Sequence, residues 1–215
     1  MKISILGTNG FLSAAIAKFS IQEGWKLYMY GLEAPKQHGC DAFHKVNFMD
    51  NDFDCSALLD SDMIVYAGGA GIQSNLQEGC RVIYHLNVTV PVGICNQLRT
   101  LNYKGCFVTF GSVFEMGETN EQRFFSEEDI LTSVWKAPND YTVSKRMLTR
   151  FVASYQHEFT HWHFFIPTIY GAGENPKRLI PYVINAIRNN EELHFTAGDQ
   201  TRQYIHVNEV PRMLA

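Results

Sequence analysis

The sequence of 215 residues lacks the features that would place it in a membrane or on nucleic acid. It has no run of Lys and Arg, and its formal net charge of −4 is mildly acidic. No apolar stretch approaches the roughly 20 residues that span a bilayer, and Gly7 and Gly10 interrupt the first apolar run before it could form a signal peptide. We therefore expect a protein with neither a membrane nor a nucleic-acid partner.

Cysteine is sparse and irregularly placed. The five cysteines are odd in number and show no Cys-x-x-Cys spacing, which argues against a disulfide framework and a zinc site. Reduced thiols are typical of a cytoplasmic protein, so we expect a cytoplasmic location and no metal.

The sequence contains a regular alternation of short apolar runs and helical segments, without repeats or linkers. We expect strands at 2–6, 24–31, 43–48, 62–67, 104–110, 161–166 and 193–196. Helices are expected at 14–22, at 77–101 with a bend near Pro91, from residue 141 onward and at 178–189, whereas 113–139 is expected to be irregular. This alternation predicts an α/β protein with a doubly wound parallel sheet, that is, a Rossmann fold.

A glycine turn follows the first strand and opens the first helix, in the stretch Gly7-Thr-Asn-Gly10-Phe-Leu-Ser13. Gly7 permits a tight turn, and Gly10 lets backbone N–H groups approach a pyrophosphate at the helix N-terminus. Ser13 replaces a third glycine but is small enough for binding to be tolerated. The candidate cofactor-binding residues of this turn are Gly7, Asn9, Gly10, Phe11 and Leu12. An ordinary turn without a ligand is the alternative.

Two further strand ends carry candidate cofactor residues. Gly31 stands nearest the position where an NAD-binding fold has an acid for the ribose 2′-OH. Without that acid a 2′-phosphate meets no clash, and Lys36 could approach it, so we expect NADP, with NAD as the alternative. A solvated loop that touches nothing would explain the same residues. Ala67, Gly68 and Gly69 follow the fourth strand, where glycines suit either a backbone close to a ligand or a flexible turn.

Three residues suggest acid–base chemistry. Tyr141 and Lys145 are four residues apart on a predicted helix, which stacks their side chains on one face. A phenol has a pKa of about 10, and an adjacent ammonium would lower it toward working pH. Ser112, at the end of the fifth strand, could hydrogen-bond the same reacting oxygen. A surface Tyr and Lys on an ordinary helix is the alternative.

Two histidines, His161 and His163, alternate on the sixth strand and so share one of its faces. They could ligate a metal, but we identify no carboxylate or cysteine as a partner for them. We therefore favour a structural role.

These motifs together resemble the extended short-chain dehydrogenase/reductase family, in its NAD-dependent epimerase/dehydratase branch that acts on nucleotide sugars. The matching stretches are Gly7-x-x-Gly10-x-x-Ser13, Asn87-Val, Phe-Gly-Ser112, Tyr141-x-x-x-Lys145, Pro-Thr-Ile-Tyr-Gly-Ala-Gly at 167–173 and Thr201-Arg202-Gln-Tyr-Ile-His-Val207. The resemblance runs along the whole chain, with the motifs in family order.

The resemblance implies a role for each site residue. Tyr141 would be the acid/base, Lys145 would bind the nicotinamide ribose and lower the Tyr141 pKa, and Ser112 would orient the substrate's carbonyl or hydroxyl. Thr168 would join Ser112 in binding substrate. Arg202 would bind the diphosphate of the sugar nucleotide, with a surface ion pair to Asp199 or Glu209 as the alternative.

Departures from the family narrow the chemistry. Val113 and Phe114 stand where the 4,6-dehydratases carry Asp-Glu, so we set dehydration aside. Phe114 and Ala172-Gly173-Glu174 replace the Cys and His of the 3,5-epimerase/4-reductases. The sequence thus predicts NAD(P)-dependent reduction of a nucleotide-diphosphate 4-keto-6-deoxyhexose, in deoxysugar or surface-polysaccharide synthesis. The alternatives are an NAD-dependent nucleotide-sugar 4-epimerase and a catalytically silent nucleotide-binding module.

The resemblance also bears on organisation. We expect a cofactor-binding core at 1–166 and a partial, apparently truncated substrate lobe at 167–215, because relatives continue beyond the last motif. A homodimer is expected, since the family often pairs the long helix and the Tyr141 helix with their copies. The apolar residues available for this are Val82, Ile83, Leu86, Met147 and Phe151, with packing onto the sheet as their alternative use.

Overall fold

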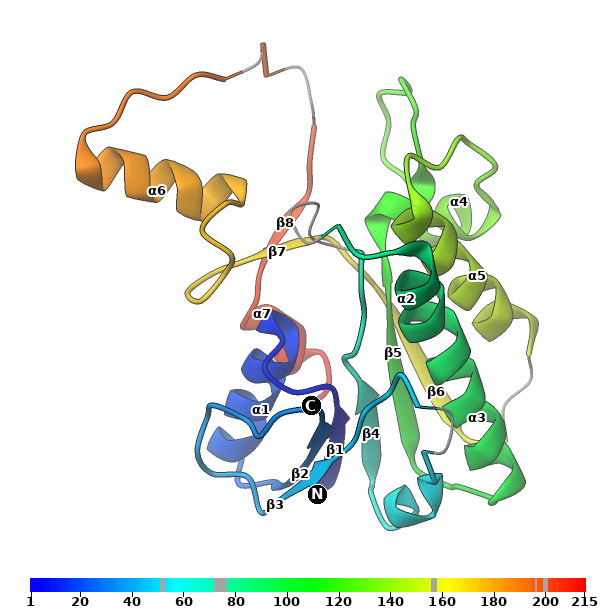
Figure 1. Cartoon of the computed structure of the whole chain (residues 1–215). Coiled ribbons are helices and arrows are strands. Elements are labelled where there is room, and N and C mark those ends of the chain that lie inside the picture. The colour runs from blue at the N-terminus through cyan, green and yellow to red at the C-terminus, as the bar shows by residue number, and fades with distance from the viewer. Residues whose placement is uncertain (51–52, 72–76, 156–157, 196, 199–200) are drawn as a thin grey trace.

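The computed structural model describes residues 1–50, 53–71, 77–155, 158–195, 197–198 and 201–215 (Figure 1). One parallel sheet is built from β1 (Lys2–Leu6), β2 (Lys26–Gly31), β3 (Ala42–Lys45), β4 (Met63–Tyr66), β5 (Cys106–Ser112) and β6 (Thr160–Ile166). Their order is β3-β2-β1-β4-β5-β6, and all neighbours pair in parallel. This confirms the predicted doubly wound sheet, whose strand order reverses between β1 and β4, the place where such folds bind ligands.

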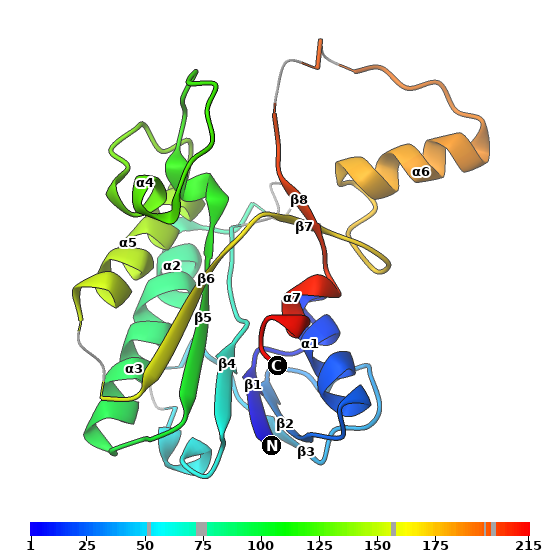
Figure 2. The ribbon, with the colours of Figure 1, turned by 180° about the vertical axis from the view of Figure 1, so that it is seen from behind.

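Helices cover both faces of this sheet (Figures 1 and 2). One face carries α1 (Phe11–Gln22) and α7 (Glu209–Arg212), and the other carries α2 (Cys80–Tyr84), the π-helical turn η3 (His85–Thr89), α3 (Val90–Thr100) and α5 (Asp140–Ser154). The remaining helical elements are the 3-10 turns η1 (Cys55–Leu58) and η4 (Val113–Met116), with α4 (Glu127–Thr132) and α6 (Leu179–Asn189).

The core consists of two apolar clusters, one on each face, because successive strand residues point to opposite sides. Ile3 and Ile5 of β1 pack with Ile16 of α1. Leu6 lies on the other face with Leu98 of α3. These side chains are completely buried or nearly so, and each contributes about 1.5–3 kcal/mol by leaving water.

Several expected elements begin, end or fold differently in the structure. Helix α1 begins at Phe11, ahead of the expected residue 14. The bend expected near Pro91 is a π-helical turn just before it, and Pro91 itself occupies the first turn of α3, which continues directly from that turn.

Two expectations were wrong. Residues 127–132 form a helix, because Ser126 and Asp129 make a reciprocal capping box. Residues 193–195 form no strand, and residue 196 lies outside the described residues. A strand needs a hydrogen-bonding neighbour, and alternating apolar residues do not supply one.

The C-terminal region forms a second, small sheet. Strand β7 (Thr168–Tyr170) pairs in parallel with β8 (Tyr204–His206), and α6 between them stands apart from the main sheet in both views (Figures 1 and 2). Helix α7 then returns to the core, where Val210 and Leu214 pack in the β1 cluster. The division at residue 166 stays a prediction. Among the described residues, none of the helices combines the length and apolarity needed to cross a membrane.

Candidate active site

The turns after β1 and β4 touch at the carboxyl edge of the sheet. Gly7 has a φ of +111°, and a Cβ there would lie 2.9 Å from the backbone nitrogen of Gly68. Only glycine satisfies both the conformation and the contact. The structure thus brings together two of the predicted cofactor turns, with the Ala67 N–H donating to the Leu6 carbonyl beside them (2.8 Å).

The N-terminus of α1 is open to an anion. Gly10 precedes the helix without a side-chain cap, and the first turn has no acidic residue, so neither the cap residue nor an acid of that turn occupies the first N–H groups. Ser13 is fully buried and donates its hydroxyl to the Gly10 carbonyl (3.0 Å). Serine in place of the third glycine therefore leaves the turn intact. The N-terminus of α1 with its glycine turn fits a pyrophosphate.

The loop after β2 is fastened to the glycine turn. The Thr8 hydroxyl donates to the Glu33 carbonyl (2.7 Å), the Asn9 amide donates to the Ala34 carbonyl (2.9 Å), and the Lys36 N–H donates to Asn9 Oδ1 (2.9 Å). A side chain on Gly31 would collide with the Thr8 hydroxyl. Position 31 therefore lacks the acid for the ribose 2′-OH, and Thr8 also leaves too little space for an acidic side chain there.

The predicted catalytic residues meet where β5 ends beside α5. Asn139 caps α5 by accepting from the Thr142 N–H (2.9 Å), so the helix begins just before Tyr141. The Ser112 hydroxyl is close enough to the Tyr141 phenol to lower its pKa. The Lys145 ammonium donates to the Phe110 carbonyl (2.8 Å) and lies 5.8 Å from the Tyr141 ring centroid. All three side chains are buried.

The electrostatics of the Tyr141–Lys145 pair differ from the sequence-based expectation. Burial raises the pKa of Tyr141 to about 12, although the Ser112 hydroxyl lowers it in part. Burial also lowers the pKa of Lys145 to about 8. We expected the ammonium to dominate the Tyr141 pKa, but the causes of its shift here are burial first, then Ser112, Glu115 and Arg178. The ammonium is held by the Phe110 carbonyl instead.

A buried amide ties this site to the turn after β4, and sequence reasoning noted it only as a motif. Asn87 is completely buried in the π-helical turn. Its amide donates to the Ala70 carbonyl and the Ser144 hydroxyl (both 2.9 Å) and accepts from the Ala70 N–H (2.9 Å). Since Ser144 precedes Lys145, the amide fixes α5 relative to the cofactor turns.

Arginines approach the site from the C-terminal region. Arg202, which is exposed, lies 5.8 Å from the ring of Phe114, two residues after Ser112. Glu209, one of its two alternative partners, pairs with Arg212 (3.1 Å), and the other, Asp199, lies outside the described residues.

Sequence reasoning missed Arg178. It pairs with buried Glu174 (2.7 Å) and lowers the pKa of Tyr141 from across the site. Predicted Thr168 is buried at the start of β7, where its N–H donates to the Gln203 carbonyl (3.1 Å).

The two histidines are hydrogen-bonded to threonines. The Thr109 hydroxyl bonds both His161 (2.9 Å) and His163 (2.8 Å), and His163 also bonds Thr149 (2.8 Å). Burial lowers the pKa of His163 to about 3, which keeps it neutral. Within the described ranges, no three His, Cys, Asp or Glu side chains are grouped so that they could hold a metal ion.

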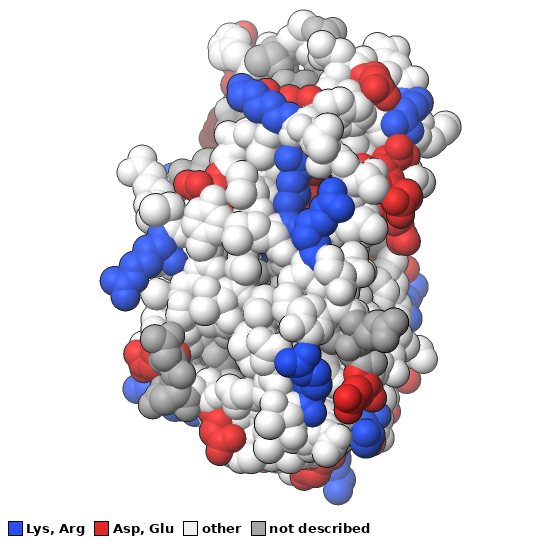
Figure 3. Space-filling view, turned by 90° about the vertical axis from the view of Figure 1, so that its right-hand side faces the viewer, with Lys and Arg blue, Asp and Glu red and all other residues white. Residues whose placement is uncertain are grey.

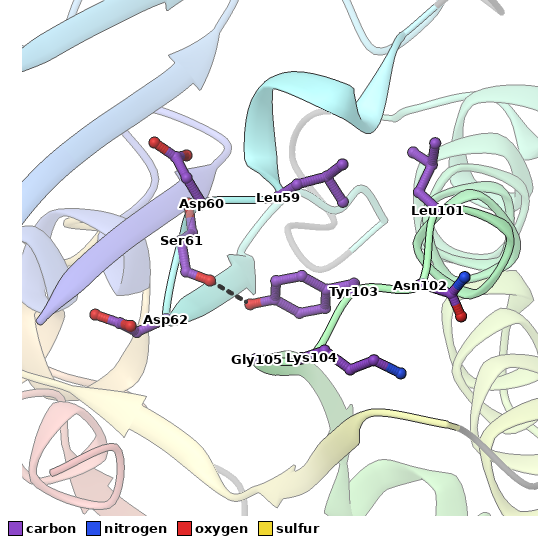
Figure 4. Close-up of a pocket in the computed structure, with 9 residues that line it drawn as sticks. All are labelled: Leu59, Asp60, Ser61, Asp62, Leu101, Asn102, Tyr103, Lys104 and Gly105. Atoms are coloured by element: carbon purple, nitrogen blue, oxygen red, sulfur yellow. Dashed lines mark hydrogen bonds between the residues drawn. The ribbon is translucent and has the colours of Figure 1, made fainter.

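A pocket of about 370 Å³ opens at the opposite edge of the sheet. Figure 4 shows it between the segments that lead into β4 and β5, with the Tyr103 hydroxyl bonded to the Ser61 carbonyl (2.9 Å). It contains none of the predicted site residues, and parallel sheets of this kind bind ligands at their other edge.

Fold and site together define a Rossmann-fold protein whose candidate site lies at the carboxyl edge of the sheet. The chain belongs to the NAD dependent epimerase/dehydratase family, whose model matches residues 3–215. This confirms the resemblance drawn from the motifs.

Individual relatives are distant. The chain is 18% identical to CDP-abequose synthase of Yersinia pseudotuberculosis, over 98% of this chain and 70% of the relative. UDP-N-acetylglucosamine 4-epimerase from Methanobrevibacter ruminantium M1, solved with UDP-N-acetylmuramic acid, aligns with a TM-score of 0.81 at 18% identity, over 98% of this chain and 70% of that one. UDP-glucuronic acid 4-epimerase from Bacillus cereus, solved with UDP-glucuronic acid and NAD, gives 0.78 at 17% identity, over 99% and 71%.

Proposed function

We propose that the protein is a nicotinamide-dependent reductase that acts on a nucleotide-diphosphate 4-keto-6-deoxyhexose. The observation that carries the proposal is the assembly of Ser112, Tyr141 and Lys145 at the edge where the glycine turns meet. Membership of the family and the distant likeness to a CDP-abequose synthase support it.

Each residue has a chemical task in this proposal. The bound dinucleotide would supply the hydride for the carbonyl carbon. Ser112 would donate a hydrogen bond to the carbonyl oxygen, and Tyr141, which burial keeps protonated, would give that oxygen its proton. Lys145 would hold the ribose and stabilise the phenolate that remains. Arg202, over Phe114, would bind the diphosphate, and Thr168 would contact the sugar.

Dehydration remains unsupported by the side chains next to Ser112. Val113 and Phe114 carry no acid, and the next residue, Glu115, is completely buried with its carboxylate on the Ser112 N–H (2.7 Å). The Glu115 carboxylate is buried and accepts a backbone hydrogen bond, so it is not placed to exchange a proton with a sugar.

For the cofactor we propose that NADPH binds at least as tightly as NADH. Gly31 offers no acid to the ribose 2′-OH, and Thr8 fills the space where one would stand. Lys36 is exposed at the end of a loop that Asn9 holds beside the glycine turn. Titration of both reduced cofactors by fluorescence tests this, and a strong preference for NADH would contradict it.

The second candidate is a nucleotide-sugar 4-epimerase, which is favoured by the likeness to two solved 4-epimerases, one of them bound to NAD. An epimerase must return the hydride from the same cofactor, whereas a reductase consumes one reduced cofactor per turnover. A catalytically silent nucleotide-binding module would do neither.

Incubation with a nucleotide 4-keto-6-deoxyhexose and, separately, with UDP-glucose separates these candidates. We expect stoichiometric loss of NAD(P)H absorbance with the first and no UDP-galactose from the second, as followed by chromatography. Interconversion of the UDP-hexoses without net cofactor consumption would replace the reductase by the epimerase. Absence of both reactions would favour the silent module.

The predicted homodimer stays a proposal, and in the structure fewer of the residues expected at its interface are available for it. Ile83 is buried, and Leu86 and Phe151 pack against the core, so these residues already serve the sheet. Met147 is 48% exposed. Figure 3, which views the side of the molecule that carries α3 and α5, shows a largely uncharged surface that is interrupted near its centre by groups of Lys and Arg, with acidic groups mainly toward its edges. Light scattering that reports a monomer at high concentration would end this proposal.

A further inference from the structure

We propose that Glu115 is a positioning residue of the site: its buried carboxylate fixes the Ser112 backbone and is the counter-charge that keeps Lys145 an ammonium. The inference rests on the proposed function, because it takes Ser112, Tyr141 and Lys145 as the reacting set. Glu115 lies in η4, three residues after Ser112, and its exposed fraction is 0%. A glutamate this deeply buried is rare unless it is paired.

The first observation is the double link between Glu115 and Ser112. Glu115 Oε1 accepts from the Ser112 N–H (2.7 Å), and Ser112 Oγ accepts from the Phe114 N–H (3.2 Å). This reciprocal arrangement holds Ser112 by both its backbone and its side chain. The hydroxyl that meets Tyr141 is therefore set by the carboxylate as well as by β5.

The second observation is the space made for the carboxylate. A Cβ on Gly111 would lie 2.7 Å from Glu115 Oε1 and 2.7 Å from His163 Nε2. Glycine before Ser112 thus lets the carboxylate enter the interior between β5 and β6. Its second oxygen, Oε2, makes no hydrogen bond of good geometry among the described residues, although Thr149 is close enough to lower the Glu115 pKa.

The third observation is that α5 holds the Glu115 segment from its other side. The Arg146 guanidinium donates to the carbonyls of Glu115 (2.6 Å), Met116 (3.0 Å) and Trp135 (2.8 Å). Because Arg146 follows Lys145, the same helical turn that carries the ammonium fastens the backbone that carries the carboxylate.

The charges around Glu115 favour its ionised form. The titratable groups that face it are Tyr141, Lys145 and Arg146 from α5 and His163 from β6, which is neutral. Burial is the largest effect and leaves the pKa of Glu115 raised, while Thr149, the Ser112 N–H, Lys145 and Arg146 lower it. In return Glu115 raises the pKa of Lys145 against the effect of burial. It also raises that of Tyr141, which preserves the phenol needed to donate a proton in reduction.

The consequence concerns the protonation of Lys145. The pKa of Lys145 is already lowered to about 8. Without a compensating negative charge, the pKa of this buried ammonium would be lower still. A neutral Lys145 would no longer stabilise the Tyr141 phenolate. Glu115 thereby sets the upper pH at which the site works, without touching the substrate.

The test is the titration of Lys145 in Glu115→Gln, which keeps an acceptor for the Ser112 N–H but removes the charge. Lysine-selective ¹⁵N NMR follows Lys145 Nζ, assigned by its loss in Lys145→Met. We expect the midpoint to fall by about one pH unit or more, and the alkaline limb of kcat to move with it. Glu115→Asp keeps the negative charge, so its Lys145 midpoint should lie close to that of the unaltered protein. Glu118→Gln, which changes an exposed acid three residues further on, is the matched control and should leave the midpoint unchanged.

A folded Glu115→Gln protein with an unchanged Lys145 midpoint would overturn the inference. Should this variant fail to fold, the ¹³C signal of the Glu115 carboxyl in the unaltered protein decides: a carboxyl still protonated at pH 8 contradicts the counter-charge, and an ionised one supports it. Neither readout needs turnover. If the Lys145 midpoint falls in Glu115→Gln as expected but the protein reduces no nucleotide 4-keto sugar, the proposed function is refuted and the role of Glu115 as a counter-charge is not.

Discussion

Replacement of Lys145 by methionine should stabilise the fold near neutral pH, and the gain should disappear as the pH rises. The ammonium is buried, and burial lowers its pKa from 10.5 to about 8. At about 1.4 kcal/mol per pH unit, this fall corresponds to about 3 kcal/mol. Methionine has a similar length and carries no charge, so Lys145→Met removes this cost of burial.

The direction in which the free energy of unfolding changes with pH follows from proton binding by Lys145. Below about pH 8, Lys145 is protonated in both the folded and the unfolded chain, and the fold carries the full cost of the buried charge. Between about 8 and 10.5, the folded protein has released the proton while the unfolded chain still binds it. The stability of the unaltered protein therefore rises with pH across this window, and the advantage of Lys145→Met shrinks by about 3 kcal/mol.

Urea unfolding followed by tryptophan fluorescence at a series of pH values from about 6.5 to 10.5 measures this difference. Other titrating groups are common to both proteins and largely cancel, apart from Glu115, whose pKa Lys145 lowers. Lys104→Met, at an exposed lysine, controls for the loss of one positive charge without burial. A stability difference between Lys145→Met and the unaltered protein that stays constant over the whole range would refute the reasoning from burial.

Three further predictions concern activity and cofactor choice. Tyr141→Phe should slow turnover by about 10²–10⁴-fold, the usual contribution of one positioned acid, with little change in the cofactor dissociation constant; a variant that retains most of its activity would remove Tyr141 from the mechanism. The kcat of the unaltered protein should fall as the pH rises through about 8, because Lys145 then loses its proton, and a flat profile to pH 10 would contradict this. Gly31→Asp should lower the melting temperature without creating an NADH preference, because it collides with Thr8, whereas the double change with Thr8→Gly should favour NADH in a fluorescence titration.

Local sequence patterns were good predictors of the parallel sheet and of the turns that leave it. The apolar run at 2–6 and the glycine turn after it appear as β1 and the start of α1. The spacing of Tyr141 and Lys145 placed both on one face of α5. These features depend on residues close together in the chain, where periodicity and backbone conformation suffice.

Long-range contacts account for what the sequence analysis missed. Glu115 stood in a stretch expected to be irregular, and nothing in its immediate neighbours indicated that it would be completely buried. Asn87 was noted as a motif, but its bond to Ser144 joins residues far apart in the chain. Arg178 acts on Tyr141 from the position just before the start of α6.

The sequence by itself determined the fold class and the edge of the sheet where the site would form, because parallel strands deliver their carboxyl ends to one side. The tertiary structure alone decided the electrical character of that site. Burial raises the pKa of Tyr141 to about 12 and lowers that of Lys145 to about 8, and Glu115 opposes the second shift. Desolvation and the field of a distant charge depend on what surrounds a group in space, which no short stretch of sequence specifies.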